Sequence, residues 1–336
     1  MLRLGIVGCG RVTTMFHLKA IKEVEEVTVA AVTDRDPGRM EQVKAKSGAE
    51  RGYNDYRRLL ADPEVEAVAV NTPPRFHEEM TVEALRAGKH VLCEKPLAQS
   101  IEGCINIGEA ERETGLTVLP VHNYAFTPCL ETAKEIIQSG EIGEIGRVEQ
   151  CFDNNLWSYR SRTDFRMEER FGIVEDVLPH VLSVAQAMAG PADGVEEAKG
   201  WMKSYEVVDN LSLLMRTEDC VEIDCSMNWT SLIPSFNVGV VGDSGRVDME
   251  LMKRPFRVSV ESTVGKRKID RKGLGKYLDI MRLKHPAFLE QYRHFVRVVE
   301  GSEPPRFTVG DEVSMRRVMD EVSRRLSETD ITQGSQ

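Results

Sequence analysis

An aspartate and a histidine have the residue types and spacing that acid–base chemistry requires. Asp176 and His180 lie four residues apart around Pro179, a spacing that brings both side chains to one face of a helix. Proline suits the first turn of a helix, so Asp176 is expected near the helix start and His180 within the first turns. A histidine titrates near neutral pH, and a neighbouring carboxylate can orient its ring. An N-capping aspartate with a packed histidine is the alternative; no third ligand at motif spacing is present, so no metal is predicted.

A lysine follows a predicted strand where ligands bind in open parallel sheets. Glu94-Lys95-Pro96-Leu97 comes directly after the apolar run Val91–Cys93, and ligands in such sheets lie beyond the carboxyl ends of the strands. A lysine ammonium there can stabilise negative charge that develops on a reacting oxygen. A solvated lysine in a turn is the alternative.

The N-terminal segment has the features of a dinucleotide-binding loop. Gly8-Cys9-Gly10 follows a strand-like run and opens a helical segment. Glycines there let the chain turn tightly and let its backbone approach a pyrophosphate. The third small position is Thr13, so the match to the glycine pattern is incomplete. Asp34 closes the second predicted strand, 24 residues beyond Gly10; a carboxylate there accepts hydrogen bonds from a ribose 2′-hydroxyl and repels a 2′-phosphate.

The acidic residue therefore predicts NAD as the cofactor. Arg35, beside Asp34, softens that preference, and NADP is the alternative cofactor. A plain turn begun by an aspartate is the other interpretation. Asn71-Thr72-Pro73-Pro74 ends the strand Ala67–Val70 and is placed to contact the cofactor, as is His77 at the start of the next helix. A proline-rich turn and a helix-capping or surface histidine are the alternatives.

These candidate residues need a scaffold of alternating strands and helices. Continuous apolar runs, typical of parallel strands covered on both faces, occupy Arg3–Val7, Val27–Thr33, Ala67–Val70, Val91–Cys93 and Thr117–Val121. Helical patterns occupy Phe76–Ala87 and Ile101–Glu113. The pattern predicts an α/β fold, with a doubly wound parallel sheet over residues 1–121.

The second half has a different pattern. Cys220–Trp229 alternates apolar and polar residues, which predicts an antiparallel strand with one wet face, and Gly242-Asp243-Ser244-Gly245 predicts a hairpin turn. Further strands are predicted at Asn210–Arg216 and Arg257–Glu261, and helices at Leu130–Gln138, His180–Met188 and Phe288–Glu300. Residues 122–326 are therefore predicted to form an α+β domain with a mainly antiparallel sheet, followed by a frayed tail, 327–336.

Five residues are candidates for substrate contacts. His122, Asn123 and Tyr124 lie at the predicted domain junction, where a substrate pocket would open. Trp157 and Arg160 lie in a polar, aromatic loop that could cover a ligand. A solvated surface loop is the alternative for these last two.

The composition excludes several function classes. The 336 residues include 44 Lys and Arg and 54 Asp and Glu, a net charge of −10, so no electrostatic footprint for a nucleic-acid backbone is expected. No apolar run approaches the ~20 residues of a membrane span. The chain enters a strand-like segment at once, so no signal peptide is expected. Seven scattered cysteines without a Cys-x-x-Cys pair predict reduced thiols in a cytoplasmic protein.

Several segments together resemble the glucose–fructose oxidoreductase and inositol dehydrogenase (Gfo/Idh/MocA) family, over nearly the whole chain. The matching segments are Gly5–Val12, Thr72–Pro74 with His77, Ala87–Ala98, and Asp176 with His180. The resemblance implies a Rossmann domain followed by a domain with a large open sheet. It implies oxidation or reduction of a sugar or polyol with NAD or NADP. It also implies oligomer contacts through the sheet, as in a homodimer or homotetramer.

The resemblance assigns roles by motif. Lys95, Asp176 and His180 correspond to the catalytic trio. The cofactor-binding residues expected from the loop pattern and the resemblance together are Gly8, Gly10, Arg11, Val12, Asp34, Arg35, Asn71, Thr72, Pro73, His77, Glu94 and Lys95. A cis Lys95–Pro96 peptide bond is compatible with this turn.

The leading hypothesis is an NAD-dependent dehydrogenase that acts on a sugar-like secondary alcohol. His180 would take the hydroxyl proton, Asp176 would orient His180, and Lys95 would stabilise the alkoxide. Leu178 replaces the glycine of the family pattern Asp-x-Gly-x-His, and Tyr124-Ala125-Phe126 lacks a basic residue often present there. These departures motivate an alternative, a non-catalytic dinucleotide-binding sensor or regulatory subunit. A lyase or hydrolase that retains NAD through a redox cycle is a third hypothesis.

Overall fold

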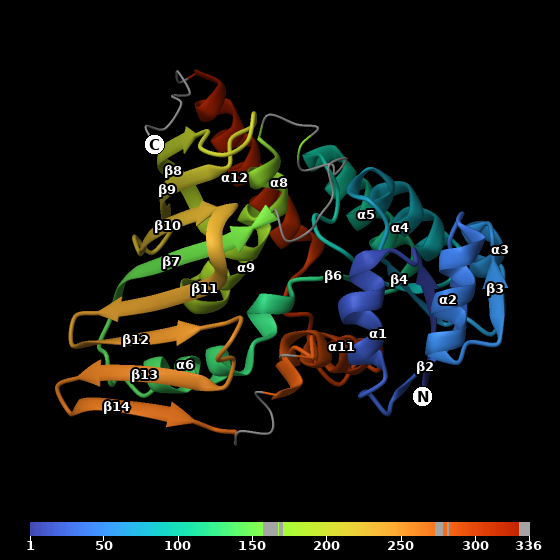
Figure 1. Cartoon of the computed structure of the whole chain (residues 1–336), viewed down its shortest axis with the longest axis horizontal. Coiled ribbons are helices and arrows are strands. Elements are labelled where there is room, and N and C mark those ends of the chain that lie inside the picture. Colours follow the sequence, from blue (N-terminus) through green and yellow to red (C-terminus); the bar gives the residue numbers. More distant parts are fainter. Residues whose placement is uncertain (157–166, 168–170, 273–277, 281, 329–336) are drawn as a thin grey trace. The chain divides into compact units, whose positions relative to one another are not determined.

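The computed structural model describes residues 1–156, 167, 171–272, 278–280 and 282–328, which form two compact units (Figure 1). Unit 1 comprises Met1–Asn123 and Asp279–Val313, and unit 2 comprises Tyr124–Leu278 and Ser314–Gln336. The sequence prediction assigned 279–313 to the second domain; in the structure this segment returns to unit 1. The reason is that apolar side chains of this segment pack in a hydrophobic core of unit 1.

Unit 1 is built on a six-stranded parallel sheet in the order β3-β2-β1-β4-β5-β6. This order places the topological switch point between β1 and β4, where ligands bind in such folds. The strands are β1 (Leu2–Val7), β2 (Val27–Thr33), β3 (Arg51–Tyr53), β4 (Ala67–Val70), β5 (His90–Cys93) and β6 (Val118–Pro120). The predicted doubly wound sheet is confirmed, with the short edge strand β3 in addition.

Several helices of unit 1 begin after a residue whose side chain satisfies a free backbone N–H group. Asp36, Asp55 and Ser100 cap three of them, each accepting from a backbone N–H of the first turn. The helical elements are η1 (Thr13–His17), α1 (Leu18–Ile21), α2 (Pro37–Ser47), α3 (Tyr56–Leu60), η2 (Pro74–Phe76), α4 (His77–Arg86), α5 (Ile101–Thr114) and α11 (Pro286–Val299). The first of these, η1, is a π-helical turn, which sequence periodicity did not predict.

Two hydrophobic cores cover the two faces of this sheet. Leu4 and Ile6 of β1 belong to one core and Val7 to the other, as expected for strands buried on both faces. The first core also contains Phe288, Tyr292, Phe295 and Val296 of α11. The apolar stripe of α11 therefore covers the sheet of unit 1, which explains why 279–313 belongs to this unit.

Unit 2 is built on an eight-stranded sheet in the order β14-β13-β12-β11-β7-β10-β9-β8. The strands are β7 (Ile145–Asn155), β8 (Ala192–Trp201), β9 (Asn210–Thr217), β10 (Glu222–Asn228), β11 (Thr230–Gly242), β12 (Gly245–Glu250), β13 (Arg257–Ser262) and β14 (Gly265–Asp270). The alternating burial predicted for β10 and the β11–β12 hairpin are confirmed. β10 was predicted to be an antiparallel strand, and this is correct for one neighbour but wrong for the other. It pairs antiparallel with β9 but parallel with β7.

The described helices that accompany this sheet are α6 (Pro128–Gln138), α8 (Gly172–Asp176), α9 (Leu178–Ala189) and most of α12 (Val309–Glu328). Both α6 and α9 pack on the sheet. Arg316 of α12 is buried and forms ion pairs with Glu175 of α8, 2.8 Å, and with Asp320, 2.7 Å. A buried guanidinium with two carboxylate partners ties α12 to the helix that precedes α9.

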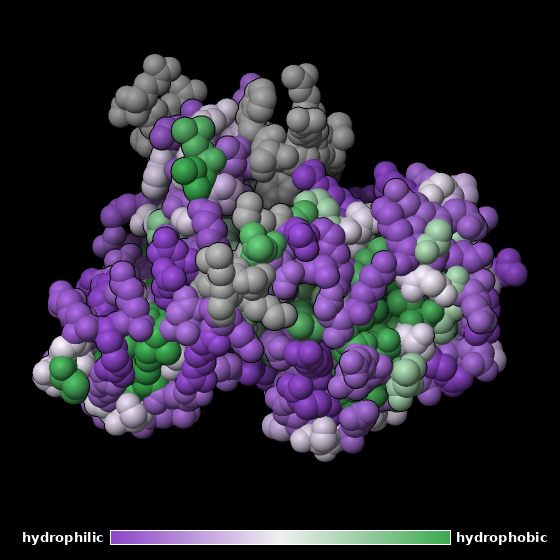
Figure 2. Space-filling view, turned by 60° about the horizontal axis from the view of Figure 1, so that its bottom comes forward, coloured by the Kyte–Doolittle hydropathy of each residue, from purple (hydrophilic) through white to green (hydrophobic). Residues whose placement is uncertain are grey.

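The surface and the thiols agree with the composition. The face drawn in Figure 2 is mostly hydrophilic, with hydrophobic residues in smaller groups. No helix in the described part of the chain combines the length and apolar character that a membrane crossing needs. All seven cysteines are free thiols.

Candidate active site

The glycine loop after β1 makes a close approach that excludes any side chain at its first glycine. Gly8 has a φ of +94°, and a Cβ there would lie 2.8 Å from the carbonyl oxygen of Asn71. The Thr13 hydroxyl donates to the Gly8 carbonyl at 2.7 Å, and the Asn71 amide donates to Thr13 at 3.2 Å. The threonine that breaks the glycine pattern thus joins the loops after β1 and β4.

Gly10 lies in the same loop and has open space around it. A Cβ built on Gly10 would meet no atom of the described residues within 4 Å. Packing within unit 1 therefore does not require glycine here, whereas a ligand that contacts the backbone would. The helical segment 11–21 follows at once, with Arg11 exposed and Val12 half-buried, so a pyrophosphate at this loop would face backbone N–H groups.

Asp34 follows β2 at the same edge of the sheet. Its carboxylate is half-buried and accepts from the backbone N–H groups of Cys9 and Asp36, both at 2.8 Å. These bonds hold the carboxylate beside the glycine loop. Its oxygens can still accept further hydrogen bonds, for example from a ligand hydroxyl. Burial, and next the Asp34 charge, raise the pKa of Cys9 to about 12, so this thiol stays protonated. Arg35 is exposed.

The loop after β4 carries a buried acceptor without a partner. Asn71 is buried, and its Oδ1 has no hydrogen-bond partner among the residues that the structure describes. A buried unpaired acceptor costs about 1–3 kcal/mol, which a ligand donor at this position would offset. Thr72 is half-buried and Pro73 exposed.

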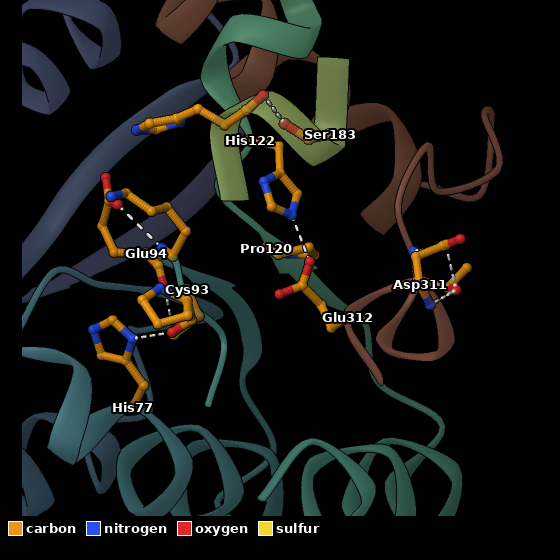
Figure 3. A network of polar contacts seen from close by, with 12 residues as sticks. His77, Cys93, Glu94, Pro120, His122, Ser183, Asp311 and Glu312 are labelled. Carbon is orange, nitrogen blue, oxygen red and sulfur yellow. Dashed lines mark hydrogen bonds and ion pairs between the residues drawn. The ribbon is translucent and has the colours of Figure 1, made fainter. Parts of the chain in front are cut away.

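His77 joins the loops after β4 and β5. Its Nδ1 lies 2.7 Å from the carbonyl oxygen of Pro96 and its Nε2 lies 2.7 Å from that of Thr72, and Figure 3 shows its side chain in this position. Burial lowers the pKa of His77, and the two carbonyl oxygens oppose that shift because they favour a protonated ring. The Lys95–Pro96 peptide bond is cis.

Glu94 and Lys95 are the first two residues after β5. Glu94 is buried, and its carboxylate accepts from the ring of His17 at 2.8 Å and from the backbone N–H of Lys95 at 3.1 Å. Burial alone would raise the pKa of Glu94, but the hydrogen bond from His17 and the neighbouring charges, that of Lys95 among them, together outweigh burial, and the pKa is lowered. Lys95 is half-buried. An ionised carboxylate therefore lies directly beside the candidate catalytic lysine.

His122 and Asn123 follow β6 and are both buried. The Nε2 of His122 lies 2.5 Å from the carboxylate of Glu312, and Figure 3 shows the ring pointing at that carboxylate. The ring also packs edge-on against Phe307. These contacts within unit 1 favour a packing role for the His122 ring.

The remaining candidates belong to unit 2. Asp176 ends α8 and is buried, whereas His180 is half-buried in the first turn of α9. The ring of His180 stacks on Phe152, with centroids 5.9 Å apart and planes 4° apart, and Tyr124 meets it edge-on at 5.0 Å. The two rings restrict the orientation of the imidazole. Leu178, between the two candidates, is fully buried.

The helix expected to carry both Asp176 and His180 is interrupted. Val177 separates α8 from α9 and is the N-terminal flanking residue of α9. Trp157 and Arg160 lie outside the described residues. No group of three or more metal-ligating side chains occurs within the part of the chain that the structure describes.

Sequence reasoning missed several residues that hold this site. Neither His17 nor Tyr292 was singled out from the sequence as a site residue, yet both join a hydrogen-bond chain to Glu94. Arg316 gave no sequence signal. One sequence signal could have identified His17 as a site residue. It follows Gly8-Cys9-Gly10 closely, on a helix expected to start at the cofactor loop.

Two family models match the chain. Residues 2–122 match the model described as "Oxidoreductase family, NAD-binding Rossmann fold", and residues 130–248 match the "GFO/IDH/MocA C-terminal domain". The two matches together cover most of the sequence.

Several curated relatives are named as dehydrogenases or reductases, and others as uncharacterized oxidoreductases. A 1-carboxy-3-chloro-3,4-dihydroxycyclo hexa-1,5-diene dehydrogenase of Comamonas testosteroni is 28% identical over 79% of this chain and 68% of its own length. Inositol 2-dehydrogenase 2 of Saccharopolyspora erythraea is 36% identical over 42% of each chain. For such partial matches, the chain spans less than half of the relative's length.

Solved structures share the fold over nearly the full length. A 3-ketoreductase from Actinomadura kijaniata, in complex with NADP and TDP-benzene, has a TM-score of 0.81 at 23% identity and covers 96% of this chain and 97% of its own. A levoglucosan dehydrogenase, in complex with NADH and levoglucosan, has a TM-score of 0.83 at 19% identity, with 97% of both chains covered.

Proposed function

Because this chain belongs to the GFO/IDH/MocA family of NAD-binding oxidoreductases, we propose that it transfers a hydride between NAD and a secondary alcohol of a sugar, sugar derivative or polyol. The observation that carries the proposal is the carboxyl edge of the unit 1 sheet. There Gly10 leaves its backbone open, Asn71 has a buried acceptor that is unpaired among the described residues, and Lys95 follows β5 at the same edge. The names of relatives, such as myo-inositol 2-dehydrogenase and levoglucosan dehydrogenase, support the substrate class.

The residues of this edge fit a dinucleotide. In the proposal, the loop from Gly8 to Val12 holds the pyrophosphate, and Asp34 with Arg35 faces the adenosine ribose. Residues 71–73, His77, Glu94 and Lys95 surround the nicotinamide half. NAD, when bound, supplies the hydride acceptor, and the protein supplies position and charge. An acceptor carboxylate at Asp34 favours NAD, and NADP remains the alternative cofactor.

The catalytic roles are assigned to three side chains. His180 takes the hydroxyl proton as the alcohol is oxidised, and Asp176 orients His180 from four residues earlier in the chain. The Lys95 ammonium stabilises the alkoxide that this proton transfer creates. The rings of Phe152 and Tyr124 support the proposal because they restrict the His180 imidazole. Asn123, Tyr124, Trp157 and Arg160 are proposed substrate contacts.

The test is NADH formation with a panel of sugars, sugar nucleotides and polyols. Lys95→Met should lower kcat about 10²–10³-fold, the usual effect of removing one stabilising group, while the thermal shift on adding NAD stays near that of the wild type. Lys46→Met, at an exposed lysine of α2, is the matched control and should keep full activity. A fully active Lys95→Met would refute the assigned role. NAD binding without turnover of any panel member would instead support the sensor hypothesis.

The oligomer and the compartment are parts of the same proposal. We propose that copies of the chain associate through the eight-stranded sheet, as a dimer or tetramer. Leu232 and Ile233 of β11 are 89% and 69% exposed, and apolar side chains so placed favour burial in an interface. Light scattering should give a mass of two or four chains, and Leu232→Asp should shift it toward the monomer. A cytoplasmic location suits the seven free thiols.

A further inference from the structure

A chain of buried hydrogen bonds connects α11 to the end of β5. The Tyr292 hydroxyl lies 2.8 Å from Nδ1 of His17, and Nε2 of His17 lies 2.8 Å from Oε1 of Glu94. Both Tyr292 and His17 are fully buried. The Glu94 carboxylate, drawn in Figure 3, is the last acceptor of this chain. Three segments that are far apart in the sequence therefore meet in one polar line inside unit 1.

The direction of each hydrogen bond follows from the donors present. Within the described residues, His17 is the hydrogen-bond partner of the Tyr292 hydroxyl. Burial raises the pKa of Tyr292 well above its usual value, so the phenol stays protonated. Its O–H group donates a hydrogen bond to Nδ1 of His17. A neutral imidazole that accepts at Nδ1 carries its proton on Nε2. His17 therefore donates to Glu94, and every proton in the line has an acceptor.

The line ends at the candidate catalytic lysine. The second oxygen of Glu94 accepts from the backbone N–H of Lys95 at 3.1 Å. A carboxylate held at one oxygen by His17 can thus fix the backbone from which the Lys95 side chain starts. We propose that Tyr292 and His17 are positioning residues that orient Glu94 and, through it, Lys95.

Packing alone does not account for this arrangement. The ring of His17 meets Phe288 and Tyr292 edge-on, with centroids 5.2 and 5.8 Å apart, and an apolar side chain could fill the same volume. A buried hydroxyl and imidazole are costly unless they are paired. His17 also closes the π-helical turn Thr13–His17, a rare local structure that is frequent at functional sites.

The kinetic test rests on the proposed function and uses a variant that removes only one oxygen atom. Tyr292→Phe should lower kcat roughly three- to tenfold, the effect of one lost neutral hydrogen bond, with KM for NAD and substrate within twofold of wild type. Tyr53→Phe is the matched control, because the Tyr53 hydroxyl donates to Asp62 at 3.1 Å in the same unit; it should keep kcat. An unchanged kcat in Tyr292→Phe, whatever its stability, would overturn the proposal.

A double-mutant cycle identifies the route. If Tyr292 and His17 act through the Glu94 carboxylate, Tyr292→Phe should have little effect on kcat in a Glu94→Gln background. Equal losses in both backgrounds would show that the tyrosine acts otherwise and would refute the proposal. His17→Gln, which can still donate to Glu94, should recover part of the kcat that His17→Leu loses.

Two readouts do not depend on turnover and separate this inference from the proposed function. The ¹⁵N shifts of the His17 ring should report the tautomer with its proton on Nε2, and the other tautomer would overturn the inference. The rate at which acetic anhydride modifies Lys95, followed by peptide mass spectrometry, should change at least about twofold in Tyr292→Phe. An unchanged rate would refute the link to Lys95 even if no substrate is found.

Discussion

Replacing the two glycines of the β1 loop by alanine separates the requirements of the fold from those of the cofactor. Gly8 has a φ of +94°, and a Cβ there would lie 2.8 Å from a backbone oxygen and 2.9 Å from the carbonyl carbon of Asn71. The left-handed conformation costs a non-glycine residue roughly 1–2 kcal/mol. Overlap with backbone that cannot rotate away adds about 1–3 kcal/mol. Gly8→Ala should therefore lower the free energy of unfolding by about 2–5 kcal/mol.

Gly48 provides the control for the conformational part of this loss. Its φ is +79°, and a Cβ there would have open space for 4 Å around it within the described chain. Gly48→Ala should thus cost only the roughly 1–2 kcal/mol of the left-handed conformation. The difference between the two variants, measured by urea unfolding followed by circular dichroism, reports the steric overlap at Gly8. Equal losses would refute the close approach to Asn71.

Gly10 tests the cofactor instead. A Cβ on Gly10 meets no described protein atom within 4 Å, so Gly10→Ala should unfold at the same urea concentration as the wild type. If a pyrophosphate contacts the Gly10 backbone, the added methyl group occupies its place, and NAD affinity should fall at least about tenfold, the lower part of what such overlap costs. Isothermal titration with NAD measures it. Wild-type affinity in this stable variant would refute the position assigned to the pyrophosphate.

Two further predictions concern charge. Arg316→Met leaves Glu175 and Asp320 without their partner. It should destabilise the protein by roughly 2–4 kcal/mol, somewhat less than the loss of a fully buried pair, because the Asp320 side chain is 48% exposed. Arg324→Met, at a 54% exposed arginine, should leave the urea midpoint close to that of the wild type, and equal effects of the two variants would contradict the role of burial. The folded structure lowers the pKa of Glu94. At pH values above the unfolded pKa of about 4.3, the ionised carboxylate therefore stabilises the fold. This stabilisation is lost as the pH falls through the lower pKa of the folded state. The free energy of unfolding of the wild type should therefore fall more steeply than that of Glu94→Gln below about pH 4.5, and parallel curves would show that Glu94 is not stabilised as an ion.

Local features of the sequence determined the N-terminal architecture and most of its cofactor loops. Apolar runs of three to seven residues located β1, β2, β4 and β5 within a residue or two, because parallel strands buried on both faces leave a continuous apolar signature. The order of a strand, Gly8-Cys9-Gly10 and a helix placed the glycine loop. Asp34, Asn71 and Lys95 were expected at one edge because the carboxyl ends of parallel strands meet there, and the strand pairings agree.

Only the tertiary structure decided which distant segments complete the site. His17 and Tyr292 are 275 residues apart; an apolar stripe shows that α11 is buried on one side, but not that it covers the sheet of unit 1. Alternation shows that one face of β10 is buried, but not that its neighbour β7 runs parallel to it. Thr13 replaces a glycine by making two hydrogen bonds that depend on where β4 ends. Sequence periodicity records whether a side chain is buried, whereas its partner is set by long-range packing, and this is why the positioning residues emerged only from the folded chain.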